Sequence, residues 1–108
     1  MSWTIEFVNR TAESEVKALP ADMIARFLRI GNLIQVQGLM GVHEPYVKHL
    51  EDKLWEMRLK GRDGIARSIY VAASGERVVV SRTFVKKADA APRREIELAF
   101  ARMKEMQP

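Results

Sequence analysis

The stretch LWEMRLKGRDGIARSIYVAASGERVVVSRTFVKK, residues 54–87, decides the fold. It contains runs in which apolar residues recur at every second position, as in β-strands that cover a core with one face. Asp-Gly at residues 63–64 and Ser-Gly at residues 74–75 separate the runs, and such pairs are typical of tight turns between antiparallel strands. The sequence therefore predicts a three-strand meander over residues 54–60, 65–73 and 77–86.

The rest of the chain predicts one further strand and three helices. Alternation near residues 3–8 indicates the strand. Apolar residues at spacings of three and four indicate amphipathic helices, for which Asn9 and Thr11 are candidate caps. Pro20 and Pro92 suit the first turns of two of these helices, because proline needs no helical N–H partner there. The predicted helices cover residues 12–19, 20–37 and 92–105.

Length and composition agree with one α+β domain over residues 1–108, with a small, twisted and mostly antiparallel sheet. The chain has no cysteine and only two histidines, too few for an ordinary zinc site, so we expect no metal and no other cofactor. No apolar run approaches the roughly 20 residues that span a bilayer. The N-terminal residues do not resemble a signal peptide, so we expect a cytoplasmic protein without a membrane partner.

The positive charge is concentrated in the meander. The net charge is +4, and residues 57–87 alone carry +6, because eight cations face only Asp63 and Glu76. Such cations either solvate exposed strand faces or bind a polyanion, of which nucleic acid is the most common. The charge pattern leaves both interpretations open. The eight cations are Arg58, Lys60, Arg62, Arg67, Arg77, Arg82, Lys86 and Lys87.

Four segments in order resemble the RelE/HigB superfamily of bacterial toxins. They are LWEMR, RSIYV, TFVKK and APRREIELAFARM, and they are most similar to the phage-associated HigB-like branch. The resemblance implies a RelE-like fold, with two helices on one side of the sheet and a C-terminal helix. It also implies the toxin of a type II toxin–antitoxin system, a ribosome-dependent mRNA endonuclease. The implied partners are mRNA on the ribosome and a cognate antitoxin, which in this family often carries a helix-turn-helix domain.

RNA cleavage without a metal has a physical basis in this chain. The ribose 2′-OH is the nucleophile, and the site must stabilise charge on the phosphate and move protons to and from the oxygens. Guanidinium groups match phosphate oxygens bidentately, and a lysine among other cations has a lowered pKa. The resemblance and this chemistry together indicate catalytic roles for Arg58, Arg67 and Lys87. The residues expected to contact RNA are Lys60, Tyr70, Arg82 and Lys86.

Arg67 interrupts an otherwise apolar strand face, so it either lines a cleft or forms a buried ion pair with Glu56. Tyr70 either stacks on a base or packs in the core. The chain also departs from the family pattern: Arg82 replaces a histidine, Glu56 replaces a lysine, and Ala91 replaces a threonine that would cap the last helix. Two alternatives stay open, a ParE-like toxin that inhibits gyrase by binding and an inactive prophage protein with the same fold.

Overall fold

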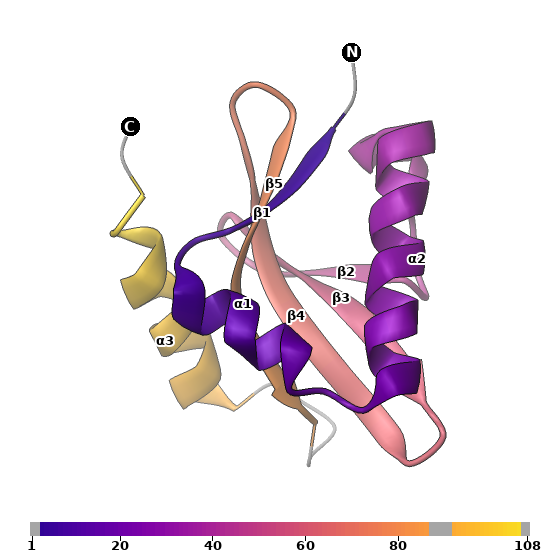
Figure 1. Cartoon of the computed structure of the whole chain (residues 1–108). Helices are drawn as coiled ribbons and strands as arrows, with labels where there is room; N and C mark the ends of the chain where they lie inside the picture. The colour runs from indigo at the N-terminus through magenta and orange to yellow at the C-terminus, as the bar shows by residue number, and fades with distance from the viewer. Residues whose placement is uncertain (1–2, 87–91, 107–108) are drawn as a thin grey trace.

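The computed structural model describes residues 3–86 and 92–106, and it confirms the α+β fold. Within these residues, a five-stranded sheet lies between helices on its two faces (Figure 1). The strands are β1 (Thr4–Phe7), β2 (Val47–Glu51), β3 (Leu54–Gly61), β4 (Gly64–Ala73) and β5 (Arg77–Val85). The helices are α1 (Arg10–Lys17), α2 (Ala21–Gln37) and α3 (Arg93–Met103), with a short 3-10 turn η1 (Leu39–Gly41) after α2.

The strand order is β1-β5-β4-β3-β2, and every neighbouring pair is antiparallel except β1 with β5. The three predicted strands of the meander therefore occupy the centre of the sheet, and β1 and β2 form its two edges. The first strand of the chain returns to lie beside the last, with Ile5 opposite Val78 and Phe7 opposite Val80. This parallel pairing places α1 beside the C-terminal half of β5, where the two elements form an ion pair.

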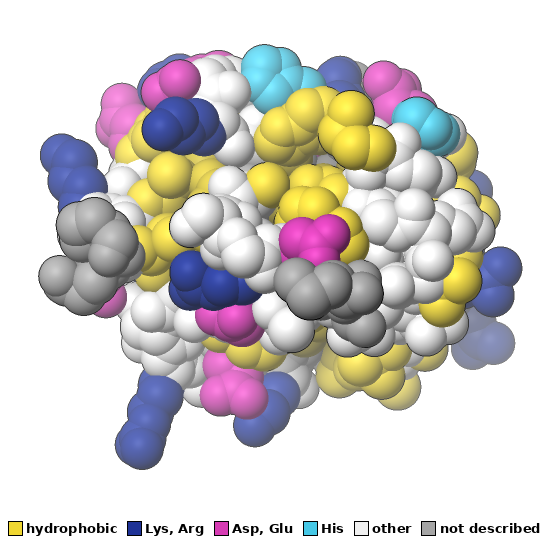
Figure 2. All heavy atoms as spheres, turned by 90° about the horizontal axis from the view of Figure 1, so that it is seen from above, with side chains coloured by type: hydrophobic (Ala, Val, Ile, Leu, Met, Phe, Trp, Pro, Cys, Tyr) yellow, Lys and Arg dark blue, Asp and Glu magenta, His cyan; other side chains and the backbone are white. Residues whose placement is uncertain are grey.

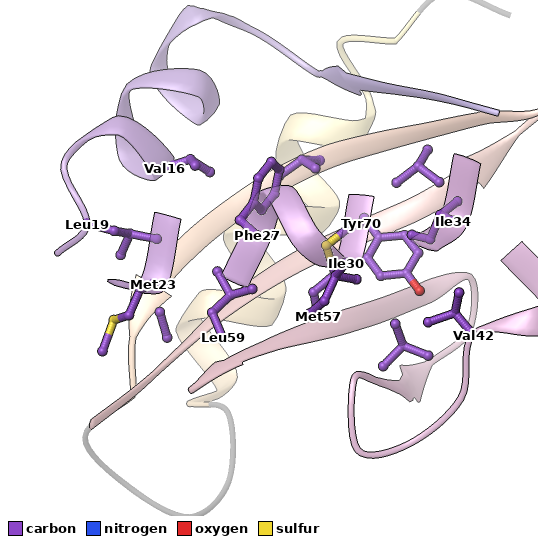
Figure 3. Packing of buried hydrophobic residues seen from close by; sticks show 14 residues of the cluster. Val16, Leu19, Met23, Phe27, Ile30, Ile34, Val42, Met57, Leu59 and Tyr70 are labelled. Carbon is purple, nitrogen blue, oxygen red and sulfur yellow. The ribbon is translucent and has the colours of Figure 1, made fainter. Parts of the chain in front are cut away.

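Two apolar clusters, one on each face of the sheet, hold the layers together. The larger cluster joins α1 and α2 to the sheet, and Figure 3 shows Phe27, Ile30 and Tyr70 among its side chains. The smaller cluster joins α3 to the opposite face through Ile96 and Ala99. Because both faces of β4 and β5 are covered, buried residues follow one another without alternation, as at residues 66–71 of β4 and 78–81 of β5.

The structure corrects one expectation about the sheet, because residues 47–51 form an edge strand. The sequence predicted no strand between the linker at residues 42–46 and residue 54, since only Val47 and Leu50 are apolar in the run from 47 to 51. The strand is set by its antiparallel pairing with β3, where Val47 lies opposite Met57. The connecting turn has Asp52 in the left-handed region with φ 52°.

Beyond Met57, β3 has no strand partner on its outer edge in the described part of the chain, and we call this part the open end of β3. The antiparallel partner β2 reaches only to Met57, and the N–H of Arg58 donates to the carbonyl of Tyr46 at 2.8 Å. Beyond this bond, β3 runs beside the N-terminal turn of α2, where the backbone N–H of Arg62 donates to Oδ2 of Asp22 at 2.6 Å. Gly61 permits this close approach, since an added Cβ would lie 2.9 Å from both Asp22 Oδ2 and Met23 Cγ.

None of the helices in the described part of the chain is long and apolar enough to span a membrane.

Candidate nucleic-acid interface

Arg67 and Glu56 form a buried ion pair on the sheet face that α3 covers. Nη1 of Arg67 lies 3.1 Å from Oε1 of Glu56, and the two side chains are 6% and 0% exposed. Burial raises the pKa of the Glu56 carboxyl above its usual value and outweighs the opposing effects of Arg67, Arg58 and Lys48. The pair therefore satisfies a charge that the apolar strand face could not otherwise hold.

This geometry decides between the two sequence-based interpretations of Arg67. A guanidinium that lines an open cleft would be exposed, whereas Arg67 is buried against Glu56. The cleft hypothesis is therefore corrected: in this conformation Arg67 is an internal partner of Glu56 and has little surface for a phosphate. The family-pattern lysine at residue 56 would have placed a second cation here, and Glu56 reverses the sign of the charge.

Tyr70 also differs from its expected role. Its side chain is 1% exposed and packs in the cluster beneath α2, as Figure 3 shows. Burial raises the pKa of its hydroxyl well above the usual range. The expectation that Tyr70 stacks on a base is corrected to a core position, because no ring face is open to a nucleotide.

Arg82 lies at the junction of α1, β5 and α3, in contact with two carboxylates. It donates from Nη1 to Oε2 of Glu15 at 2.6 Å and from Nε to Oε1 of Glu95 at 2.7 Å. Arg102 donates to both oxygens of Glu15 at 2.8 Å, and the N–H of Thr83 donates to the same carboxylate. Although burial opposes it, the bonds from Arg102, Thr83 and Arg82 hold the pKa of Glu15 below its usual value.

The Arg82 network ties the two terminal helices to the last strand. Its arginine replaces the histidine of the HigB-like pattern, so no imidazole is available at this position for proton transfer. An RNA contact of Arg82 stays a prediction, and its guanidinium would have to share its charge with Glu15 and Glu95.

The remaining predicted cations lie at the open end of the sheet. Arg58 is half-buried and Lys60 is exposed, both on the part of β3 that β2 leaves unpaired. Lys86 follows β5, and its N–H donates to the carbonyl of Ile65 at 2.7 Å. Lys87 lies outside the described residues. The structure thus brings Arg58 and Lys60 together, and it separates both from Arg82.

The structure adds cations that sequence reasoning missed. Arg26 and Arg29 of α2 line a depression of about 710 Å³ together with Lys60 and Arg62. A helical periodicity that places the apolar face of α2 on the core puts these arginines on its flank. The helical periodicity therefore predicts that Arg26 and Arg29 lie beside the apolar face of α2, but it does not predict which strand lies next to them.

His43 lines a hollow of about 310 Å³ together with Arg29, whereas His49 lies in the edge strand β2. Figure 2 views the molecule from above, the end opposite the β3–β4 turn, and shows both histidines beside exposed hydrophobic side chains. Nε2 of His49 donates a hydrogen bond to the carbonyl oxygen of Asp52 at 2.8 Å, and the imidazole stands edge-on to Trp55 at 5.0 Å between ring centroids. Across residues 3–86 and 92–106, no group of three or more histidine or acidic side chains could hold a metal ion.

Comparison with known proteins identifies a phage family. The family model described as phage derived protein Gp49-like (DUF891) matches residues 14–104, which covers most of the chain from α1 to the end of α3. This family lies in the RelE/HigB-like toxin group. No curated protein matches the chain. The match supports the resemblance at the level of the toxin group, and the HigB-like branch is a finer assignment.

Proposed function

Since the chain belongs to the phage-derived Gp49-like family, we propose that it is the toxin of a type II toxin–antitoxin system, of the HigB-like branch. In this proposal the protein acts in the cytoplasm and cleaves mRNA on the ribosome. A cognate antitoxin, with a helix-turn-helix domain of its own, neutralises it. The reaction uses arginine and lysine side chains and the 2′-OH of the substrate, without a metal.

The observation that carries this proposal is the division of the cations into two groups. Arg67, Arg77 and Arg82 each pair with a carboxylate. In contrast, no ion pair within the described ranges involves Arg58, Lys60, Arg62 or Lys86. Cations that a protein leaves without carboxylate partners on one end of a sheet are suited to an external polyanion.

We assign the phosphate contacts of the reaction to Arg58 and Lys87. Arg58 stabilises the negative charge of the scissile phosphate with two parallel hydrogen bonds from its guanidinium group. Lys87 acts as an acid or a base on the reacting oxygens, or adds positive charge near the phosphate. Arg67 acts behind them: its pair with Glu56 keeps the strand face that carries Arg58 in register. Lys60 and Lys86 contact neighbouring phosphates.

A second candidate is favoured by one specific observation. Two arginines of the expected site, Arg67 and Arg82, are engaged by carboxylates in the folded protein. A toxin that acts by binding alone, as ParE-like proteins bind gyrase, does not need these guanidiniums to converge on a phosphate. An inactive prophage protein would tolerate the same arrangement.

Induction of the protein in bacteria tests the proposal. We expect growth arrest, new mRNA 5′ ends within coding sequences, and rescue by co-expression of the adjacent open reading frame. The variant Arg58→Gln should lose cleavage by about 10²–10³-fold, the usual effect of one preorganised donor. Intact mRNA together with altered plasmid supercoiling would select the gyrase-binding candidate, and normal growth without rescue effects would select the inactive protein.

A further inference from the structure

A groove runs between the flank of α2 and the open end of β3. Two adjoining hollows form it, one of about 710 Å³ and one of about 250 Å³. Arg26, Tyr46 and Lys60 line both hollows, so the two are continuous. Its lining residues include Asp22 in the first turn of α2 and Arg62 in the β3–β4 turn, two segments that lie beside one another (Figure 1).

The groove is strongly positive. Five cations line it, and Asp22 is its one acidic lining residue in the described part of the chain. Oδ2 of Asp22 already accepts the backbone N–H of Arg62 at 2.6 Å. None of the ion pairs found in residues 3–86 and 92–106 involves a cation of the groove. The five cations are Arg26, Arg29, Arg58, Lys60 and Arg62.

An aromatic ring lies in the middle of these charges. Tyr46 is half-buried, and it lines both hollows and a third hollow of about 310 Å³ farther along α2. Its backbone is held in place, because its N–H donates to the carbonyl of His43 and its carbonyl accepts from Arg58. The ring is therefore positioned by the start of the β2–β3 pairing and does not depend on a loop alone.

We propose that this groove binds single-stranded RNA, with phosphates on Arg26 and Arg29 and a base stacked on Tyr46. Cations spread along a groove, with an aromatic ring between them, are the features by which proteins hold single strands without reading sequence. The assignment rests on the proposed function only in that RNA is the natural partner. It places the RNA along α2, on Arg26, Arg29 and Tyr46, which lie outside the basic meander of residues 54–87.

Binding of a fluorescein-labelled oligouridylate of about eight nucleotides, a length suited to such grooves, tests the arginines. The variant Arg26→Gln/Arg29→Gln removes two groove charges. The control Arg10→Gln/Arg94→Gln removes two exposed helical arginines from α1 and α3, so both variants have the same net charge. Anisotropy titrations over a range of salt concentrations give the slope of log K against log salt.

We expect the groove variant to lower the magnitude of that slope by about 1.4, since each phosphate contact with a single strand contributes roughly 0.7. The control variant should leave the slope unchanged. Equal slopes for both variants would overturn the proposal, because the binding would then follow net charge and not the groove.

The ring is tested separately by Tyr46→Phe and Tyr46→Leu, which keep an apolar side chain of similar size. Phenylalanine should retain the affinity, and leucine should weaken it roughly tenfold, within the range that a lost stacking contact produces. A duplex RNA of the same length should bind more weakly than the single strand. Tighter binding to the duplex, or an unchanged affinity of Tyr46→Leu, would reject the single-strand assignment.

The nuclease proposal and the groove assignment can fail independently of each other. If the wild-type protein leaves cellular mRNA intact while the groove variant loses oligonucleotide binding, the groove assignment stands and the nuclease proposal fails. If Arg26→Gln/Arg29→Gln binds and cleaves like the wild type, the groove assignment fails and the nuclease proposal stands. A groove that prefers an acidic protein, shown by wild-type binding to the antitoxin but not to the oligonucleotide, also overturns the RNA assignment.

Discussion

Arg67→Ala removes the guanidinium that balances a fully buried carboxylate. Nη1 of Arg67 lies 3.1 Å from Oε1 of Glu56, and Oε2 of Glu56 has no hydrogen-bond partner that the described residues provide. The variant therefore leaves Glu56 buried in an apolar strand face, where, among the described residues, only the charges of Arg58 and Lys48, which form no ion pair with it, offset its burial. Removing one partner of a buried pair costs about 3–5 kcal/mol, because the remaining charge keeps its desolvation penalty. We expect a loss of that size in the free energy of unfolding near neutral pH.

The loss should depend on pH. Burial already raises the pKa of Glu56 above its usual value of 4.5, so its contribution to stability is favourable below that value and is lost as pH rises through the folded-state pKa. Removing Arg67 takes away an effect that lowers this pKa, so the folded-state value rises further. The variant therefore takes up its proton at a higher pH than the wild type, and its destabilisation should be smaller at about pH 5 than at about pH 7.5.

The chain contains a matched control. Arg77 pairs with Glu6 at the same 3.1 Å, but these side chains are 40% and 41% exposed. Because water screens an exposed pair, Arg77→Ala should cost about 1 kcal/mol or less and show little change between the two pH values. Urea unfolding followed by circular dichroism at both pH values measures all three proteins. The double variant Glu56→Gln/Arg67→Met should recover part of the loss, since it removes both charges at once.

The reasoning is refuted if Arg67→Ala is no less stable than Arg77→Ala, or if its loss grows as the pH falls. Either result would mean that water or a rearranged side chain solvates Glu56, and that the pair does not hold the face of the sheet. A stable Arg67→Ala that also fails to cleave mRNA would return Arg67 to a direct role at the phosphate.

Three further predictions concern other contacts of the fold. Glu15→Gln weakens the network with Arg102 and should cost about 1–3 kcal/mol at neutral pH; because the folded-state pKa of Glu15 is lowered, the wild type should lose more stability than this variant as the pH falls below 4.5, which acid titration followed by circular dichroism measures. Gly61→Ala places a Cβ 2.9 Å from Oδ2 of Asp22, and it should destabilise the protein by about 1–3 kcal/mol in urea unfolding, whereas an unchanged midpoint would show that α2 can shift away. Asn9→Ala removes the cap that accepts the N–H of Ala12 at 2.8 Å and should cost about 1 kcal/mol, with Asn9→Ser as the variant that retains a cap.

Local sequence patterns determined the elements with strong periodicity. The three central strands, the first strand and the helices lie within one or two residues of their predicted ranges, because alternation and helical spacing are properties of neighbouring residues. Helix α1 begins at Arg10, two residues before its predicted start, because Asn9, and not Thr11, provides the cap. The edge strand β2 escaped prediction because its conformation depends on pairing with β3.

The candidate site was predicted less completely than the fold. The sequence indicated that Arg67 needs either a cleft or a carboxylate, and it named Glu56 as the carboxylate. The choice between these outcomes depends on register and burial: Glu56 lies opposite Ile69, two residues from Arg67 on the neighbouring strand, beneath the face that α3 covers. No local pattern specifies that a helix from the end of the chain will pack on this face of the sheet.

The sequence by itself determined the order of the strands and helices other than β2, their apolar faces and the basic character of residues 57–87. Those properties follow from the spacing of residues along the chain, which fixes the side of an element on which each side chain lies. Only the tertiary structure decided which cations face carboxylates and which face solvent. Arg82 meets Glu15, 67 residues away, while Arg26 and Lys60 come together without a carboxylate between them. The physical reason is that an ion pair or a groove needs two surfaces in contact, and contact between distant elements follows from the packing of the whole core.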